Sequence, residues 1–415
     1  MGKPRVLVIG AGTGGLCLAH GLRAAGIDVR VYERDRTPTD RQQGYRLTIN
    51  GSGAHALQSC LPAVSFQRYI AASARISTAV TFLDHRLRRL LVVELDETDQ
   101  SAPHAPRPIA RSALRQILQE GLEDVVEMGK TFASFEIAPD HVTARFEDGS
   151  SAQGDLLIGA DGANSRVRGQ LLPHAQRIDT GLLAISGKAP LDAVARSEFP
   201  GAVFEGPTLI LGPSGRFMFA GSVEYPPGPP SGLDRSEYVM WGFSAHRAQL
   251  PGAAEAADTS GEAARAVVQG CVRDWSPALQ RMVERTDLPS VTPFTIKSSL
   301  PIRPWPTGRV TLLGDALHNM TPFRGIGANT ALQDAAYLRD ALQMVCSGAK
   351  DLLPALAAYE RETISRGFAA VRASLAQMER VHARAPLQRL ATRTALRLMD
   401  TAPRLRLLAF PPGTD

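Results

Sequence analysis

The fold is decided by residues 310–334, VTLLGDALHNMTPFRGIGANTALQD. Residues 310–313 form an apolar run of strand length, and Gly314 allows a sharp turn into Asp315. Ligands of open α/β sheets bind at the carboxyl ends of the strands, where this turn would lie. The N–H groups of residues 327–329 would then open a helix, and such groups attract negative charge. The stretch therefore predicts an α/β fold with a ligand site at this edge of the sheet.

The run GDALHNMTPFRGIGAN, residues 314–329, resembles the second flavin-binding motif of the single-component FAD-dependent aromatic hydroxylases, the p-hydroxybenzoate hydroxylase-like family. The resemblance implies that Asp315 binds the ribityl chain or the diphosphate of FAD. It makes His318 a structural residue, and no side chain is assigned as a catalytic base. The loop expected beside the isoalloxazine ring supplies Pro322, Gly325, Gly327, Ala328 and Asn329.

The start of the chain predicts a complete βαβ unit, with strands at residues 5–10 and 27–33 around one helix. Its glycines form GxGxxG, which provides a tight turn, close approach of a diphosphate and close contact between helix and strand. Glu33 ends the second strand, where a carboxylate can accept hydrogen bonds from the ribose of an adenine nucleotide. The unit therefore predicts a dinucleotide site. Its expected contacts are Gly10, Gly12, Thr13, Gly14, Gly15, Glu33 and Arg34.

Two arginines farther along the chain are additional candidates for the cofactor site. Arg46 alternates with apolar neighbours and would project from the opposite face of a strand. Contact with the flavin or its diphosphate and a surface salt bridge both stay open for it. Arg111 lies just before Ser112, the expected N-cap of an amphipathic helix over residues 108–122. The family's R(S/T)xLR segment implies that Arg111 reaches the FAD diphosphate or ribityl chain.

Residues 154–168, GDLLIGADGANSRVR, predict a buried strand, a turn and the start of another element. Asp161 and Gly162 match the family's DG motif, which implies contact with the cofactor and a link to NAD(P)H use. The alternative is an ordinary connection between a strand and a helix. Upstream, strands at 132–137 and 142–146 predict an antiparallel pair.

The pattern changes to period-two strands between residues 179 and 297, with a further hairpin at 77–95 and an embedded helix at 262–275. We expect an antiparallel sheet that forms the substrate wall over the flavin. The aromatic and methionine side chains on these strands line either a pocket or the plain core. These candidates are Phe217, Phe219, Met240, Trp241 and Phe243.

The fold class expected from these patterns is α/β: a Rossmann-like FAD-binding domain, an antiparallel-sheet substrate domain and C-terminal helices. Helices over residues 353–399 should break at Ala385 and Pro386. The expected segments are 1–75, 98–178 and 298–345 for the FAD-binding domain, 76–97 and 179–297 for the substrate domain, and 346–415 for the C-terminal helical segment.

Composition narrows the class of protein further. The chain has 415 residues, of which 44% are hydrophobic. Its N-terminal apolar run is too short to span a membrane, so a cytoplasmic protein is expected. A monomer or a homodimer is expected. Its four cysteines are scattered, which favours neither a zinc site nor a disulfide framework. Residues 361–406 hold ten arginines and three acids. This excess suits a solvated helical face, a subunit contact or nucleotide phosphates, and without interleaved aromatic residues it does not suggest nucleic acid.

The resemblance implies an FAD-dependent monooxygenase that uses NADPH or NADH and O₂. It would oxygenate an electron-rich small molecule, aromatic or polyketide-like, through a flavin C4a-hydroperoxide. The residues do not identify the substrate or the position oxygenated. A flavin-dependent reductase or dehydrogenase and a non-enzymatic redox sensor stay open as alternatives. A halogenase is a third, although its WxWxIP signature is missing because Trp241, Trp275 and Trp305 stand far apart.

Overall fold

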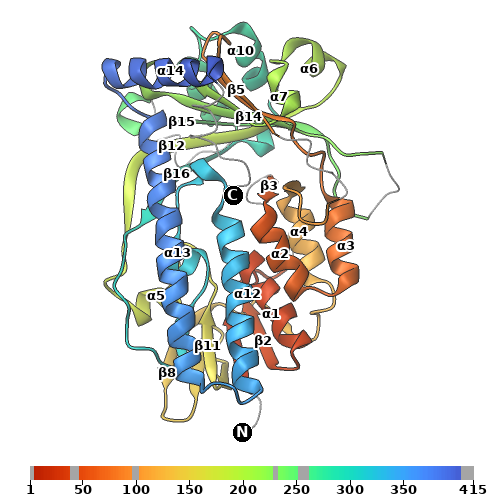
Figure 1. The fold of residues 1–415 in the computed structure, drawn as a ribbon, viewed down its shortest axis with the longest axis vertical. Helices are drawn as coiled ribbons and strands as arrows, with labels where there is room; N and C mark the ends of the chain where they lie inside the picture. Colours follow the sequence, from red (N-terminus) through yellow and green to blue (C-terminus); the bar gives the residue numbers. More distant parts are fainter. Residues whose placement is uncertain (1–3, 38–45, 96–101, 228–231, 251–260, 403–415) are drawn as a thin grey trace.

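The structure is a computed structural model that describes residues 4–37, 46–95, 102–227, 232–250 and 261–402. A parallel sheet lies at one end of the molecule and a larger sheet at the other, and long helices connect the two ends (Figure 1). The division into domains at the expected residues stays a prediction. Strands β12 (Arg177–Pro190) and β16 (Thr292–Ser299) run across those expected boundaries.

The parallel sheet has five strands in the order β17-β11-β1-β2-β7. All of its neighbours are parallel, so the carboxyl ends of β1, β11 and β17 meet at one edge. This edge therefore gathers the glycine loop, the DG turn and the GD turn, which are distant in the sequence. The strands are β1 (Arg5–Ile9), β2 (Asp28–Glu33), β7 (Val126–Met128), β11 (Leu156–Gly159) and β17 (Val310–Leu312).

Helices and a small sheet surround the parallel sheet. The antiparallel hairpin expected near residue 140 is confirmed and gains a third strand. The three strands are β8 (Phe132–Ile137), β9 (Val142–Phe146) and β10 (Ser151–Gly154). The helices are α1 (Thr13–Ala24), α2 (Gly51–Cys60), α3 (Ala63–Ala72), α4 (Arg111–Gln119), α5 (Arg166–Leu171), α11 (Asp315–His318) and α12 (Gly327–Cys346).

The helix expected over residues 108–122 is wrong at its start. Residues 107–110 form strand β6, which pairs with β3 (Arg46–Ile49), and α4 begins only at Arg111. The N-cap is therefore Ala110, without a side-chain cap, and Ser112 lies inside the first turn. Pairing with a distant strand overrides the local capping pattern, because the proline of this stretch is tolerated at the edge of a two-stranded sheet.

The larger sheet has seven strands in the order β16-β12-β15-β14-β13-β4-β5. The expected antiparallel sheet is correct for every neighbouring pair except β13 and β4, which are parallel because the β4–β5 hairpin joins the sheet from a much earlier part of the chain. The strands not yet bounded are β4 (Ala79–Asp84), β5 (Arg89–Glu94), β13 (Thr208–Leu211), β14 (Phe217–Val223) and β15 (Tyr238–His246).

One face of the seven-stranded sheet is covered by four short helices. Buried side chains from these helices and the sheet share one hydrophobic cluster around Trp241. The embedded helix ends earlier than expected, and a second helix follows after a break at Trp275. The four helices are α6 (Ala193–Glu198), α7 (Ala202–Glu205), α9 (Glu262–Cys271) and α10 (Pro277–Glu284).

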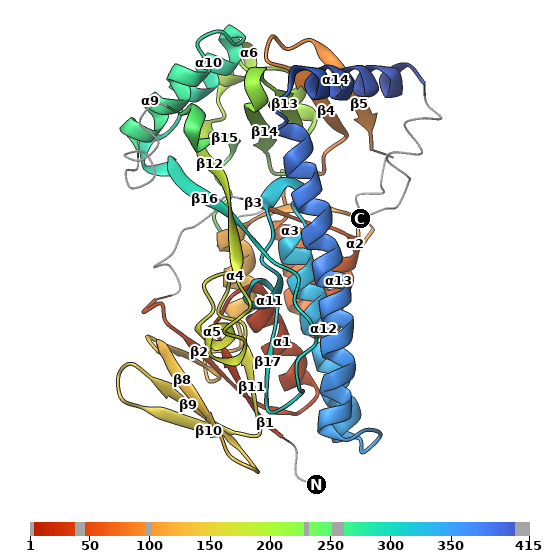
Figure 2. The same cartoon turned by 90° about the vertical axis from the view of Figure 1, so that its left-hand side faces the viewer.

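Helix α13 (Leu352–Val381) runs beside α12 and continues up to the seven-stranded sheet, and α14 (Pro386–Thr401) then crosses that end of the molecule (Figures 1 and 2). The predicted break near Pro386 is confirmed. In the arginine-rich segment, Arg366 and Arg393 point inward to hydrogen-bond partners, whereas Arg361 is exposed. Among the described helices, none combines the length and apolarity that crossing a bilayer requires.

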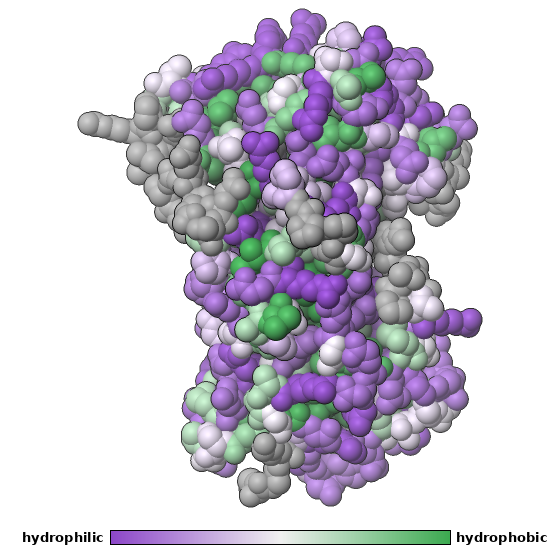
Figure 3. Space-filling view, turned by 90° about the vertical axis from the view of Figure 1, so that its right-hand side faces the viewer, coloured by the Kyte–Doolittle hydropathy of each residue, from purple (hydrophilic) through white to green (hydrophobic). Residues whose placement is uncertain are grey.

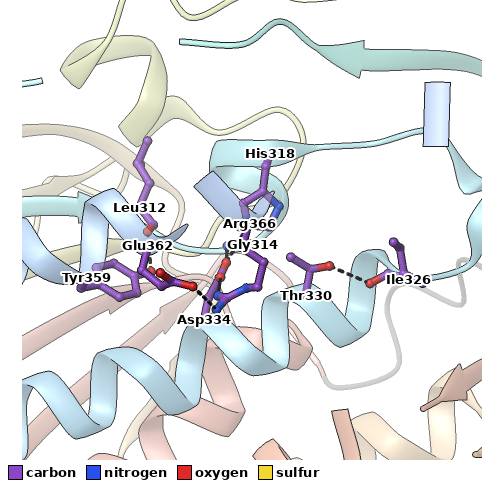
Figure 4. A network of polar contacts seen from close by, with 9 residues as sticks. All are labelled: Leu312, Gly314, His318, Ile326, Thr330, Asp334, Tyr359, Glu362 and Arg366. Carbon is purple, nitrogen blue, oxygen red and sulfur yellow. Dashed lines mark hydrogen bonds and ion pairs between the residues drawn. The ribbon is translucent and has the colours of Figure 1, made fainter. Parts of the chain in front are cut away.

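A buried carboxylate connects these elements. Asp334 of α12 accepts hydrogen bonds from Gly314 N at 3.0 Å, His318 Nε2 at 2.6 Å and Arg366 Nη2 at 2.6 Å (Figure 4). Burial opposes a charge on His318, but the neighbouring carboxylate outweighs it and raises the pKa of this histidine. Tyr359 adds a hydrogen bond from its hydroxyl to Leu312 O at 2.8 Å. The GD turn is therefore tied to α12 and α13 together.

The variant Asp334→Ala should lose about 3–5 kcal/mol of stability, because it leaves a partly buried arginine and a fully buried histidine without their carboxylate. The free energy of unfolding in urea measures this loss. Asp340→Ala is the matched control: it lies on the same helix, its side chain is 56% exposed, and its partner is Arg339 at 2.6 Å. That exposed pair should contribute only about 0–1 kcal/mol. Equal losses in the two variants would contradict the central role of Asp334.

His382 should make the protein sensitive to acid. The ring is buried, Nδ1 donates to Met378 O at 2.9 Å, and Nε2 accepts from the Ser244 hydroxyl at 2.9 Å, while burial lowers its pKa to about 4. In the unfolded chain the pKa is about 6.5. The contribution of the neutral His382 to the free energy of unfolding is therefore fully present above pH 6.5. It decreases as the pH drops from 6.5 toward 4, by at most about 1.4 kcal/mol per pH unit.

The variant His382→Gln should lack this part of the acid dependence. Unfolding measured from pH 7.5 down to 4.5 should show a steeper fall for the wild type than for this variant. Replacement of the exposed His141 by Gln is the control and should follow the wild type. Parallel curves for all three proteins would show that His382 does not cause the acid dependence.

Candidate functional site

A cavity of about 3490 Å³ is lined both by the carboxyl edge of the parallel sheet and by one face of the seven-stranded sheet. Typical small-molecule pockets measure roughly 300–1,000 Å³, so there is room for a dinucleotide and a second molecule. Figure 3 shows the molecule narrowing at the waist between its two ends. All the predicted site residues line this cavity: Gly10, Gly12, Thr13, Gly14, Gly15, Glu33, Arg34, Arg46, Arg111, Asp161, Asp315, Pro322, Gly325, Gly327, Ala328 and Asn329.

The glycines of the first loop divide into two groups. A Cβ on Gly10 would lie 2.5 Å from Ala160 O, and one on Gly15 would lie 2.2 Å from Gly10 O, so the fold itself requires both glycines. A Cβ on Gly12 would meet no atom of the described residues within 4 Å. Gly12 is the N-cap of α1, whose first N–H groups point out of the helix end without intrahelical partners. The free space at Gly12 therefore suits a ligand that carries a diphosphate.

Glu33 is held at the end of β2 by two main-chain donors. Its Oε2 accepts from Ala11 N at 2.7 Å and its Oε1 from Asp35 N at 3.0 Å. The carboxylate is nearly buried yet borders the cavity, so it is positioned for hydroxyl donors of a ligand. Arg34 beside it is exposed.

Arg115 also borders the cavity, and it was missed in the sequence. Its Nη2 lies 3.1 Å from Asp35 Oδ2, and it is the second arginine of the segment RSALR that begins at Arg111. The same motif could therefore have identified it. Arg111 itself is exposed in the first turn of α4, with its side chain lining the cavity.

Two acidic turns follow the neighbouring strands β11 and β17. Asp161 Oδ2 accepts from Arg166 N at 2.7 Å, whereas its Oδ1 is buried and has no hydrogen-bond partner among the described residues. Burial raises the pKa of Asp161. Asp315 is exposed toward the cavity, and its carboxylate has no hydrogen-bond partner in the described ranges. Both acids can therefore accept hydrogen bonds from a ligand.

The loop that leads into α12 presents main chain to the cavity. Gly325 has a left-handed φ of 66°, and neither it nor Gly327 would bring a Cβ closer than 3.7 Å to another residue. The first hydrogen bond of this helix end joins Thr330 N to Ile326 O, so the N–H groups before Thr330 have no intrahelical partner. A flat, partly negative ligand edge fits this arrangement.

Asn329 contributes to this loop through its main chain only. Its side chain accepts from Asn50 N at 3.0 Å and donates to Thr48 O at 2.9 Å, which ties α12 to β3. These hydrogen bonds fix the position of strand β3, which contains Arg46, relative to the loop before α12. The guanidinium carbon of Arg46 lies 5.8 Å from the ring centre of Phe219 on β14, and no ion pair joins Arg46 to a described acid.

The five candidate lining residues of the seven-stranded sheet lie on two opposite faces of it. Phe217, Phe219 and Met240 border the cavity. Trp241 and Phe243 are fully buried in the hydrophobic cluster behind the sheet, although Phe243 also touches the cavity. Trp241 is therefore a core residue, since neighbouring positions on a strand face opposite sides.

The site has the groups that FAD requires. Three helix starts offer N–H groups or an arginine for a diphosphate, Glu33 can accept from a ribose, and the unpartnered Oδ1 of Asp161 can accept from a further hydroxyl. Glycines open space for main-chain contact at Gly12 and Gly325. In the described part of the chain, no group of three or more His, Cys, Asp or Glu side chains is arranged to hold a metal ion.

Comparison with known proteins gives the same cofactor. The family described as FAD binding domain matches residues 3–374. A candidate FAD-containing monooxygenase of Photorhabdus luminescens subsp. laumondii has a crystal structure with a TM-score of 0.83 and 35% identity, over 92% of this chain and 99% of that one. An FAD-dependent urate hydroxylase of Mycolicibacterium vanbaalenii is 27% identical over 393 residues, 92% of this chain and 90% of that protein.

A dual O-methyltransferase/FAD-dependent monooxygenase of Cercospora beticola is 31% identical over 389 residues, 86% of this chain and 44% of that protein. The chain spans less than half the length of the first curated relatives that it matches.

The variant Gly12→Ala should separate folding from FAD binding. Its Cβ meets no protein atom, so stability should change by less than about 1 kcal/mol, the scale of an altered N-cap. FAD affinity should fall by roughly tenfold or more, because the methyl group occupies the space for the diphosphate. Thermal unfolding of the FAD-free protein and FAD titration measure the two effects.

Gly15→Ala is the contrasting variant. Its Cβ would clash with Gly10 O, so it should lose stability before FAD is added. Unchanged FAD affinity in Gly12→Ala would place the diphosphate away from α1.

Proposed function

The chain belongs to the FAD-binding-domain family of single-component FAD-dependent monooxygenases, and on that basis we propose that it uses NADPH or NADH and O₂ to oxygenate an electron-rich, aromatic or polyketide-like small molecule. The observation that carries the proposal is the continuity of the cavity. It joins the residues suited to FAD to an apolar wall on the seven-stranded sheet.

Bound FAD would accept a hydride from the nicotinamide nucleotide and activate O₂ for transfer of one oxygen atom. The residues of the chain would bind and orient the FAD. The start of α1 would hold the diphosphate, Glu33 the adenosine ribose, and Asp315 the ribityl chain. The N–H groups of residues 327–329 would stabilise negative charge that develops on the ring edge nearest to them.

The apolar wall would orient the substrate and exclude water from the reaction. Phe323, in the loop beside the proposed ring site, contacts Phe217 of the sheet with ring centres 5.7 Å apart. The loop and the sheet therefore enclose the space between them. Exclusion of water favours oxygen transfer over unproductive breakdown. An aromatic or polyketide-like substrate suits the flat, apolar lining, and an already ionised substrate would need no general base.

The relatives, which are FAD-dependent monooxygenases and hydroxylases, favour a monooxygenase over the alternatives. A reductase or dehydrogenase would consume the nicotinamide nucleotide without placing oxygen from O₂ in the product. A redox sensor would bind FAD that neither nucleotide reduces in the presence of a ligand. The partners proposed here are a small-molecule substrate, O₂ and the nucleotide, and the cytoplasm is the proposed location.

Anaerobic reduction of the FAD-loaded protein tests this function. NADPH and NADH are mixed with the protein with and without phenolic and polyketide-like compounds, and the loss of flavin absorbance is followed. We expect one nucleotide to reduce the flavin, and a compound that fits the cavity to accelerate the reduction. A subsequent pulse of ¹⁸O₂ should label the product by one oxygen atom, measured by mass spectrometry.

Reduction without ¹⁸O in any product would instead favour a reductase. Failure of both nucleotides to reduce the flavin, with every compound, would favour a redox sensor.

A further inference from the structure

Arg46 occupies the junction between the two ends of the molecule. Its strand β3 lies at this junction in both ribbon views (Figures 1 and 2). The guanidinium does not turn back to the glycine loop: its carbon is 5.8 Å from the ring centre of Phe219, and a Cβ on Gly221 would lie 3.3 Å from Arg46 Nη2. The missing side chain at Gly221 therefore makes room for the guanidinium against the seven-stranded sheet.

The charge of Arg46 is not balanced by the described part of the protein. It forms no ion pair with any described carboxylate, and among the described residues only the charge of Tyr238 would favour its protonated form. Burial lowers the pKa of this arginine. A partly desolvated cation is costly unless an anion compensates it. Since Arg46 borders the cavity, an anionic ligand group can reach it.

The surface around Arg46 is apolar. Phe219 pairs with Leu209 on β13, and Leu209 pairs in turn with Phe82 on β4, so three side chains form a continuous row on the cavity face. Met240 of β15 lies opposite Gly221 and extends the row beside the guanidinium. Lys188 of β12 pairs with Met240 and also borders the cavity, with its ammonium 4.6 Å from the ring centre of Tyr238. A guanidinium beside an apolar wall suits a ligand with a planar apolar body and a negative group.

We propose that Arg46 makes the protein select a negatively charged substrate. Its guanidinium binds the negative group, a carboxylate or an ionised phenol, of a planar molecule whose apolar body lies against the seven-stranded sheet. This inference rests on the proposed function and specifies its substrate class. It differs from the cofactor role expected for Arg46 in the sequence. For a phenol, the neighbouring cation favours the ionised form, which makes the ring more electron-rich without a separate base.

Two probes of equal shape and different charge test the inference. 2-Naphthoate and 2-naphthamide are titrated into the FAD-loaded protein, and the change in flavin absorbance gives each affinity. The wild type should prefer naphthoate by about tenfold or more, the effect of one charge-assisted hydrogen bond. Arg46→Met should lose this preference while FAD content and naphthamide affinity stay unchanged. Arg46→Lys should restore part of it, because the charge returns without the planar fork.

Arg111→Met is the matched contrast, because this arginine also borders the cavity but lies at the start of α4. It should weaken FAD and leave the ratio of naphthoate to naphthamide affinity unchanged. Loss of FAD from Arg46→Met with an unchanged ratio would assign Arg46 to the cofactor and overturn the inference. A wild type that binds both probes equally, or neither, would overturn it as well. A naphthoate preference without ¹⁸O transfer would refute the monooxygenase function and leave the anion site in place.

Discussion

The buried carboxylate of Asp334 is the interaction on which the arrangement of the site depends. It accepts from Gly314 N, His318 and Arg366, which belong to the GD turn, α11 and α13. An unpaired charge at this depth would be costly, so the three donors and the carboxylate hold one another in a single geometry. Asp315 and the loop into α12 are placed from this point, although neither is itself part of the network. A fully buried residue thereby controls the position of an exposed one.

The long helix α13 connects the parallel sheet to the seven-stranded sheet. In its first half, Tyr359 binds the end of β17 at Leu312 O, and at its middle Arg366 binds Asp334. Just beyond its end, His382 binds Ser244 on the seven-stranded sheet and contacts the Phe323 ring at 5.0 Å between ring centres. Helix α13 and the residue after it therefore contact both the end of the parallel sheet and the loop beside the proposed ring site.

The glycines of the site serve different purposes, which only their surroundings reveal. Gly10 and Gly15 avoid clashes within the protein, whereas Gly12 and Gly325 leave space that no atom of the described ranges fills. The first pair is required for folding and the second pair is available to a ligand. Motif spacing treats these positions alike, because a motif records residue types and not the distances around them. The same distinction separates Trp241, buried behind the sheet, from Met240, which faces the cavity.

The sequence by itself determined the βαβ unit, the family motifs and which residues to expect at the site. These features are local: a strand, a turn and a helix start follow from neighbouring residues. Only the tertiary structure decided that Pro108 belongs to a strand and that β13 and β4 are parallel. It also decided that the Arg46 guanidinium lies beside Phe219 of the seven-stranded sheet. Each of these results from contact between segments far apart in the chain. Such contacts depend on shape and burial in three dimensions, and no local pattern of residues encodes them.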